Sequence, residues 1–235
     1  MSMPLNMSAD GSDPAALARY HMIEQQIRPW SVLDAGVLGL LASVHREDFV
    51  PAVYRGMAFM DLEIPLPGGD AEDALGRCML APRVEARMLQ DLQIRPSDRV
   101  LEIGTGSGHM AALLARSAAQ VITLEIVPAL ADMARENLRR AAIHNAEVRQ
   151  ADGARDPIAG GPFDVIVLSG SVAELPAELL AQLGDGGRLG AIVGSEPMMR
   201  FCVARRTHGR VETSSPWDTC APRLLHFPEP SGFAF

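Results

Sequence analysis

The chain has little of what marks an exported, membrane-bound or metal-binding protein. Only three of its 235 residues are cysteine, and Cys78, Cys202 and Cys220 lack the spacing of metal ligands. A small, odd number of thiols indicates a reducing, cytoplasmic setting. No basic segment followed by an apolar run opens the chain, so no export signal is expected. No apolar run reaches the length of a membrane span.

Positive charge is also scarce. The chain has 21 Lys and Arg against 29 Asp and Glu, which gives a formal net charge of −8 at pH 7. This balance argues against a nucleic-acid-binding surface, and Arg135, Arg139 and Arg140 are expected on the solvated face of a helix. Apolar residues make up 48% of the chain, which is ordinary for a globular protein that buries a full core.

Three parts can be distinguished along the chain. Residues 1–12 are expected to be disordered, residues 13–82 to form a helical and loop extension, and residues 83–235 to form the main domain. Asp13 and Asp34 are each suited to cap a helix of the extension. The segment 61–77 is rich in proline, glycine and acid and is predicted to be a long loop. Pro82 is expected to open a helix that ends at Leu92.

The main domain alternates strand-like and helix-like segments. Strands are predicted at 99–103, 120–124, 146–150, 163–168 and 188–193, with helices between the first four and across 177–183. This alternation predicts an α/β fold with a doubly wound, Rossmann-like parallel sheet. A turn is expected at 185–187, and residues 201–205 and 223–227 are expected to add antiparallel edge strands.

A glycine-rich turn follows the first of these strands. Gly104, Gly106 and Gly108 stand at alternate positions before a helix predicted over 109–119, so the backbone can turn sharply and approach a ligand closely. The amides that begin the helix can face an anionic or carbonyl-rich group. A dinucleotide fingerprint would have its third glycine at position 109, where this chain has His109. The spacing therefore disfavours a nicotinamide-dependent oxidoreductase.

Acidic residues follow the next two strands. Glu125 is placed to accept the hydroxyl hydrogens of a ribose, as strand-end acids do in nucleotide-binding folds. Asp152, beside Gly153, is expected either to contact the amino group of an adenine or only to stabilise its own turn. Glu102, two residues before the first glycine, is expected to contact the cofactor or to cap backbone amides of the glycine turn.

Together these features resemble motif I and the strand-end acids of S-adenosylmethionine (SAM)-dependent methyltransferases. No metal site is expected. The predicted cofactor-binding residues are Glu102, Gly104, Thr105, Gly106, Ser107, Gly108, Glu125, Ile126, Asp152 and Gly153.

Five segments between about residue 20 and residue 195 resemble the protein-L-isoaspartate O-methyltransferases. Residues 22–27 are similar to the M-x-E-x-Q-I opening of that family, and residues 46–51 to its R-x-x-F-V-P. Residues 101–108 are close to its motif I, residues 162–167 to its P-Y/F-D-x-I-x-V strand, and residues 183–189 to its L-K-P-G-G-R-L. Many methyltransferases share motif I, so it is the two N-terminal segments that indicate this family.

The resemblance implies methyl transfer from SAM to the free α-carboxylate of an isoaspartyl residue in damaged protein, with S-adenosyl-L-homocysteine as the second product. A carboxylate has a reference pKa near ~4 and is ionised at neutral pH, so it needs no general base. The catalytic task is then to hold the carboxylate oxygen in line with the methyl group.

One position departs from the family pattern. The family has a T-I-S-x-P segment whose Ser contacts the substrate, and residues 78–82 correspond to it, with Leu80 at the Ser position. An isobutyl group cannot hydrogen-bond a carboxylate, at a cost of roughly 1–3 kcal/mol. Arg83 is a candidate substitute anchor, because a guanidinium pairs well with a carboxylate. Arg87, one turn later, is expected to be solvated near Glu85.

Several alternatives stay open at the level of sequence. His109 is expected either to line the methyl-transfer cavity or to lie on a helix surface, and Cys78 to be a reactive thiol or a small buried residue. Residues 68–73 form an acidic insertion. One functional alternative is a methyltransferase with another acceptor, such as a small-molecule acid or phenol, which Leu80 favours. The other is a non-catalytic SAM-binding module that acts through partners.

Overall fold

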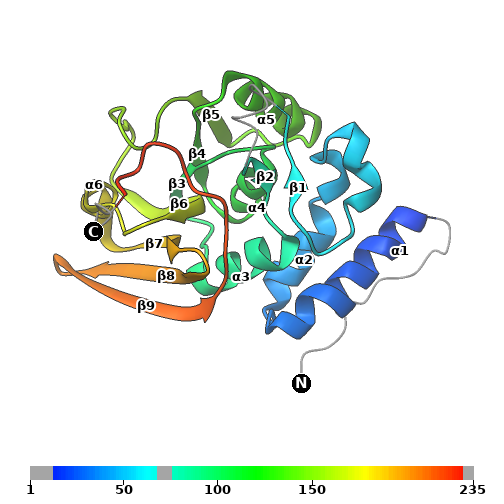
Figure 1. The fold of residues 1–235 in the computed structure, drawn as a ribbon, viewed down its shortest axis with the longest axis horizontal. Helices are drawn as coiled ribbons and strands as arrows, with labels where there is room; N and C mark the ends of the chain where they lie inside the picture. Colours follow the sequence, from blue (N-terminus) through cyan, green and yellow to red (C-terminus); the bar gives the residue numbers. More distant parts are fainter. Residues whose placement is uncertain (1–12, 68–75, 230–235) are drawn as a thin grey trace, which may run out of the picture.

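The computed structural model describes residues 13–67 and 76–229 as a mostly parallel sheet covered by helices (Figure 1). The predictions of disorder at 1–12 and of an acidic insertion at 68–73 therefore lie outside the described residues. The sheet has seven strands in the order β5-β4-β3-β6-β7-β8-β9. The predicted α/β architecture, with antiparallel strands added after the parallel ones, is confirmed.

The N-terminal extension is helical, as expected. Helix α1 (Pro14–His21) continues into a π-helical segment at 22–27 and a 3₁₀ turn at 28–30, and α2 (Ala35–Ser43) follows. Further 3₁₀ turns cover 46–48 and 52–57. The carboxylate of Asp13 accepts a hydrogen bond from the Ala15 amide, and that of Asp34 from the Val37 amide. Both predicted N-caps are thus confirmed.

The segment predicted as a loop at 61–77 contains a short strand. Strand β1 (Ile64–Pro65) pairs antiparallel with β2 (Cys78–Met79). Two-residue strands are too short to show an alternating pattern, so the loop prediction was wrong at this point. Helix α3 (Pro82–Leu92) follows with the predicted bounds.

The parallel part of the sheet consists of β3 (Arg99–Ile103), β4 (Gln120–Glu125), β5 (Ala146–Gln150), β6 (Phe163–Val172) and β7 (Leu183–Ser195). Helices α4 (His109–Ser117), α5 (Pro128–Arg140) and α6 (Ala177–Ala181) connect them. The helix predicted between β5 and β6 is absent: residues 151–162 form turns. Three glycines and two prolines in that segment oppose helix formation.

Strand β7 differs from the prediction at its start. It begins at Leu183, which pairs with Phe163, so residues 185–187 lie inside the strand and are not a turn before it. The register shifts between Phe163 and Val165, and Gly186 has a φ of +78°. A glycine is needed there because side chains disfavour this left-handed conformation. The expected turn is therefore an irregularity within the strand.

The antiparallel edge is formed by β8 (Met198–Thr207) and β9 (Arg210–Asp218). The strand predicted at 201–205 is confirmed, whereas 223–227 is not a strand and contributes one isolated bridge, from Arg223 to Ser171. The polar sequence of β9, with Pro216 inside it, hid the true edge strand. After β9 the chain runs back across the ends of the parallel strands (Figure 1).

Apolar side chains fill the space on both faces of the sheet. The three arginines of α5 are exposed, as expected, and Arg135 and Arg139 pair with Asp132 and Glu136 of the same helix. Among the described residues, no helix is long and apolar enough to cross a membrane.

Candidate active site

A cleft lies at the carboxyl ends of the parallel strands. It holds about 720 Å³ of empty space, part of it open to solvent. Its walls come from the glycine turn after β3, the end of β4, the turn after β5 and the segment 222–227. Six of the ten predicted cofactor-binding residues line it: Gly104, Gly106, Glu125, Ile126, Asp152 and Gly153.

Glycines form the floor of the cleft. Gly104 has a φ of +93° and Gly106 a φ of +54°, which a side chain would disfavour. A Cβ on Gly153 would lie 2.5 Å from Cγ2 of Ile103. The backbone is therefore exposed to a ligand at three points where a side chain would fill the space.

The other four predicted cofactor-binding residues do not line the cleft. Gly108 allows α4 to pack against α5, because a Cβ there would lie 3.3 Å from Cα of Ala134. Ser107 is buried, and its carbonyl accepts a hydrogen bond from Asn137. Thr105 is buried with its hydroxyl against that of Thr123. These residues support the turn from beneath.

Glu125 is the acid at the end of β4, as predicted. Its Oε2 accepts a hydrogen bond from the Gly106 amide at 2.8 Å, and its Oε1 from the Val127 amide at 3.0 Å. Burial raises the pKa of this carboxyl, and the backbone amides oppose that shift. A carboxylate has about four lone-pair sites. Glu125 can therefore hold the glycine turn and still accept ribose hydroxyl hydrogens.

Asp152 stabilises its own turn. Its Oδ1 accepts a hydrogen bond from the Ala154 amide at 3.0 Å, and its Oδ2 lies 2.6 Å from Nδ1 of His226. Burial opposes ionisation, yet the contact with His226 and the amide bond leave the pKa of Asp152 below its ordinary value. The His226 contact ties the segment 222–227 to the turn after β5.

Glu102 has neither of its two predicted roles. Its side chain is fully buried, does not line the cleft and accepts hydrogen bonds from the hydroxyls of Thr123 at 2.7 Å and Ser169 at 2.8 Å. Both partners are side chains on neighbouring strands, so Glu102 caps no amide of the glycine turn. Desolvation raises the pKa of this carboxyl to about 8.

The raised pKa of Glu102 predicts a pH-dependent stability. A carboxyl whose pKa is higher in the folded state contributes fully below its unfolded pKa, near 4.5, and loses that contribution as the pH rises toward 8. We therefore expect Glu102→Gln to raise the melting temperature relative to the wild type at pH 8.5 and to have little effect at pH 5. Calorimetric scans at both pH values test this. An equal difference at the two values would contradict the raised pKa.

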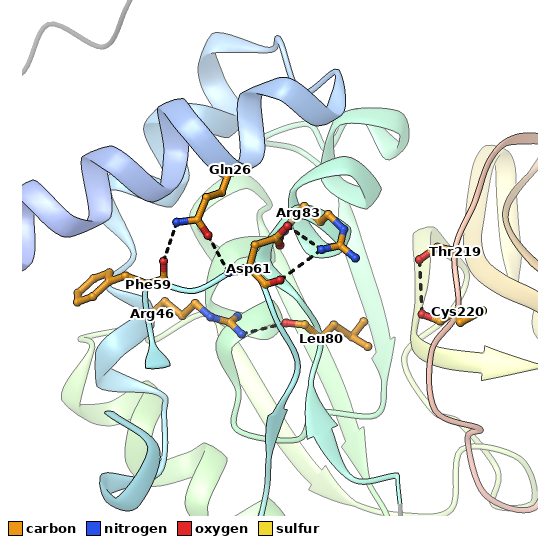
Figure 2. A network of polar contacts seen from close by, with 8 residues as sticks. All are labelled: Gln26, Arg46, Phe59, Asp61, Leu80, Arg83, Thr219 and Cys220. Atoms are coloured by element: carbon orange, nitrogen blue, oxygen red, sulfur yellow. Dashed lines mark hydrogen bonds and ion pairs between the residues drawn. The ribbon is translucent and has the colours of Figure 1, made fainter. Parts of the chain in front are cut away.

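The acceptor side of the cleft is bounded by Leu80. Leu80 is buried at the cleft wall, and its carbonyl accepts a hydrogen bond from Nη2 of Arg46 at 3.0 Å (Figure 2). Nη1 of Arg46 donates to Oε2 of Glu85 at 2.9 Å, and Nδ1 of His109 lies 2.9 Å from the same oxygen. All three ionisable side chains are at most 3% exposed. This buried triad fixes the backbone at Leu80.

The helix-surface alternative for His109 is therefore wrong. The ring is 2% exposed, packs edge-on against Phe49 and lines a second, smaller cavity shared by Leu80 and the glycine turn. Sequence reasoning missed the triad. The sequence did contain a signal for it. Glu85 is a charged residue on the face of α3 that carries Met88, Leu89 and Leu92, where an apolar residue is expected.

Arg83 does not reach the cleft. Its Nη1 pairs with Oδ2 of Asp61 at 2.6 Å (Figure 2), and its guanidinium lies 4.7 Å from the ring centre of Trp30. Arg83 lines a separate groove and already pairs with Asp61, so the structure does not bring it to the cleft. The expectation for Arg87 was wrong, because Arg87 stacks on Trp217 at 5.1 Å while Glu85 is engaged in the buried triad.

Cys78 is a half-buried residue of the cleft wall. Desolvation and the neighbouring Glu63 raise the pKa of its thiol to about 12. The thiolate is the reactive form of cysteine, so this thiol is inert at neutral pH. Sequence reasoning also missed the contribution of residues 222–227 to the cleft, which no local pattern indicated.

Comparison with known proteins agrees with this geometry. Residues 18–218 match the protein-L-isoaspartate(D-aspartate) O-methyltransferase family. The chain belongs to this family. The protein-L-isoaspartate O-methyltransferase of Methanoculleus marisnigri is 42% identical over 91% of this chain and 94% of its own. That of Koribacter versatilis is 40% identical over 84% of this chain and 86% of its own.

Structural comparison confirms the fold of the family. A Plasmodium falciparum protein described as a protein-L-isoaspartate O-methyltransferase, solved with S-adenosyl-L-homocysteine, superposes with a TM-score of 0.73 at 21% identity. The match covers 86% of this chain and 96% of that one. Family membership makes SAM the cofactor of this chain. The glycine floor and the acid at the end of β4 fit that cofactor.

Proposed function

We propose that this chain transfers the methyl group of SAM to the α-carboxylate of isoaspartyl residues in damaged protein, using the cleft at the carboxyl ends of the strands. Family membership supports the reaction. The observation that carries the assignment of the site is the glycine floor of the cleft, where the Gly106 amide donates a hydrogen bond to Glu125. The free thiols of Cys78, Cys202 and Cys220 agree with a cytoplasmic location.

When bound, SAM supplies an electrophilic methyl group on a sulfonium sulfur. The protein's own contribution is binding and orientation. The floor at Gly104 and Gly106 admits a ligand to van der Waals contact with the backbone, and Glu125 is the acceptor for ribose hydroxyls. Asp152 and Gly153, which line the cleft after β5, would contact the adenine. The apolar side chains of Leu80 and Ile103 exclude water from the acceptor side.

No proton needs to be moved, because the acceptor carboxylate is ionised at neutral pH. Rate enhancement therefore comes from aligning the carboxylate oxygen with the methyl group. The backbone at Leu80, which Arg46 holds by a hydrogen bond, provides a fixed wall against which the acceptor is positioned. The test is to incubate the protein with SAM and matched isoaspartyl and aspartyl peptides and to measure methylation by mass spectrometry. Methylation of the isoaspartyl peptide alone supports the proposal. With SAM binding demonstrated on the same sample, the absence of any adduct refutes it.

Leu80→Ser is expected to raise kcat/KM for the isoaspartyl peptide by about tenfold, because a hydroxyl restores a hydrogen bond worth roughly 1–3 kcal/mol at this wall. Steady-state kinetics with the peptide measure the change. Cys78→Ser is the matched control, since it also adds a hydroxyl to the cleft wall two residues away. A gain in the control as large as that in Leu80→Ser would show that position 80 is not special.

One observation favours a second candidate, a SAM-dependent methyltransferase with another acceptor. The Leu80 side chain at the cleft wall is apolar, and the guanidinium that holds its carbonyl, that of Arg46, is also bound to Glu85. A flat apolar acceptor with a small ionised group would suit such a wall. Methylation of a phenol or a small-molecule acid without methylation of the isoaspartyl peptide would support this candidate.

A further inference from the structure

Both tryptophans of the chain line one groove beside the cleft. Trp30 comes from the 3₁₀ turn after α1, and Trp217 comes from β9, so the two are far apart in sequence. The groove holds about 1010 Å³ of empty space, part of it open to solvent. We call it the tryptophan groove, and its walls include Trp30, Ala81, Arg83, Arg87, Trp217 and Cys220.

The tryptophan groove adjoins the acceptor side of the cleft. Ala81 lines the groove and the preceding Leu80 lines the cleft. On the opposite side, Cys220 lines the groove and Pro222 lines the cleft. Figure 2 shows the Leu80 side chain between the Arg83–Asp61 pair and the Thr219–Cys220 segment. A chain whose carboxylate reaches Leu80 from outside would therefore extend along this groove.

Arg87 is held in place within the groove. Its guanidinium lies 5.1 Å from the ring centre of Trp217. That ring is fixed in turn, because its Nε1 donates a hydrogen bond to Asp91 at 2.7 Å and its face stacks on Phe201 at 5.1 Å. Nε of Arg87 is buried and has no hydrogen-bond partner among the described residues. A buried N–H without a partner costs free energy, so the surroundings of Arg87 do not fully satisfy its guanidinium.

The other charged side chains of the tryptophan groove already have partners. Arg83 pairs with Asp61, and Asp218 pairs with Arg200 at 3.0 Å. Glu63 is hydrogen-bonded to the thiol of Cys78. Of the two arginines that line the groove, Arg83 therefore has a counterion, and Arg87 has none among the described residues. A bound carboxylate would neutralise the guanidinium of Arg87 and would accept two parallel N–H hydrogen bonds from it.

We infer that the tryptophan groove binds the polypeptide that flanks the acceptor carboxylate, and that Arg87 selects acceptors with a glutamate or aspartate nearby. This inference rests on the proposed function. Helix α3 rises about 1.5 Å per residue, so Arg87 lies roughly 7–8 Å along the helix from Pro82, which follows Leu80 by two residues. An extended peptide spans about 3.3 Å per residue, which places the acidic residue two or three positions from the isoaspartyl.

Intrinsic fluorescence gives a direct readout, because both tryptophans of the chain lie in the groove. Tryptophan-free isoaspartyl peptides carry one glutamate two or three positions before or after the isoaspartyl, and each has a glutamine counterpart. They are titrated into the protein saturated with S-adenosyl-L-homocysteine at low salt. We expect at least one glutamate peptide to bind about fivefold more tightly than its counterpart, as for one favourable charge pair.

Arg87→Gln is expected to reduce this ratio to about one, because the glutamate peptide loses its charge pair with the guanidinium. Arg87→Lys keeps the positive charge but not the paired N–H donors of the guanidinium, and it is expected to retain part of the preference for glutamate peptides. A retained preference in this variant also shows that a change at position 87 does not unfold the groove. Arg210→Gln is the control, because it removes the same charge from an exposed site at the start of β9. It is expected to keep the full preference.

Equal Kd values for the glutamate and glutamine peptides at every position would overturn the inference. If Arg210→Gln loses the preference for glutamate peptides to the same extent as Arg87→Gln, the preference comes from the overall charge of the protein. That result would also overturn the role of Arg87. The proposed function is tested separately by methylation of the same peptides. If none is methylated while the preference depends on Arg87, the proposed function fails and the groove assignment stands.

Discussion

Gly106→Val is expected to lower the affinity for SAM by about 100-fold or more, equivalent to roughly 3 kcal/mol. Two effects combine at this position. A Cβ would lie 3.0 Å from Cδ1 of Leu66, and the φ of +54° is poorly tolerated by a β-branched residue. Beyond that, the valine methyl groups would project into the cleft where the ligand meets the backbone. Isothermal titration calorimetry with SAM measures the change.

The control for Gly106→Val is Gly209→Val. Gly209 also has a left-handed backbone, with a φ of +76°, but no atom lies within 4 Å of a Cβ there. It occupies the turn between β8 and β9, away from the cleft. This variant therefore carries comparable backbone strain without obstructing the cofactor. We expect it to lose some stability and to keep its affinity for SAM. Normal SAM affinity in Gly106→Val would remove the glycine turn from the site.

Arg46→Met is expected to lower the free energy of unfolding by about 3–5 kcal/mol. The variant removes the cation that faces Glu85 at 2.9 Å and leaves that carboxylate buried with His109 alone. It also removes the donor to the Leu80 carbonyl. A loss of this size is a large part of the 5–15 kcal/mol typical of a folded domain. Urea unfolding at pH 7, followed by circular dichroism, measures it.

Two further measurements on the buried triad separate the contribution of charge to stability from that of packing: the pH dependence of stability and a double variant at Arg46 and Glu85. Burial opposes ionisation of Glu85, but His109 and Arg46 hold its pKa below the ordinary value of 4.5. Its contribution to stability is therefore present above pH 4.5 and lost as the pH falls through the lowered pKa. Arg46→Met with Glu85→Gln should recover part of the loss, because no uncompensated charge remains. A double variant no more stable than Arg46→Met alone would show that packing dominates.

The predictions that succeeded depend on local sequence. The glycine turn, the strands on either side of it and Glu125 lie within the 27 residues 99–125, and their positions follow from backbone geometry that neighbouring residues determine. The N-caps at Asp13 and Asp34 are local for the same reason. The position of the glycine turn and of the acid after β4 could therefore be predicted from sequence.

The predictions that failed depend on contacts between distant segments. Arg46 meets Glu85 across 39 positions, and Arg83 meets Asp61 across 22. Spacing along α3 shows that Arg83 and Arg87 share a face but not which face, because the partner segment decides that. The same limit applies to residues 222–227, whose place over the cleft depends on pairing with Ser171. Most of the acceptor side therefore required the structure.

The segment 222–227 has a consequence for the order in which the protein matures. Synthesis proceeds from the N-terminus, and domains begin to fold as they emerge. Every strand of the sheet is made before this segment, whose Leu224 covers Gly104 and Gly170 and whose His226 contacts Asp152. A nascent chain can thus assemble its sheet while the cofactor cleft still lacks one wall. The wall that this segment contributes to the cleft is therefore the last part of it to be synthesised.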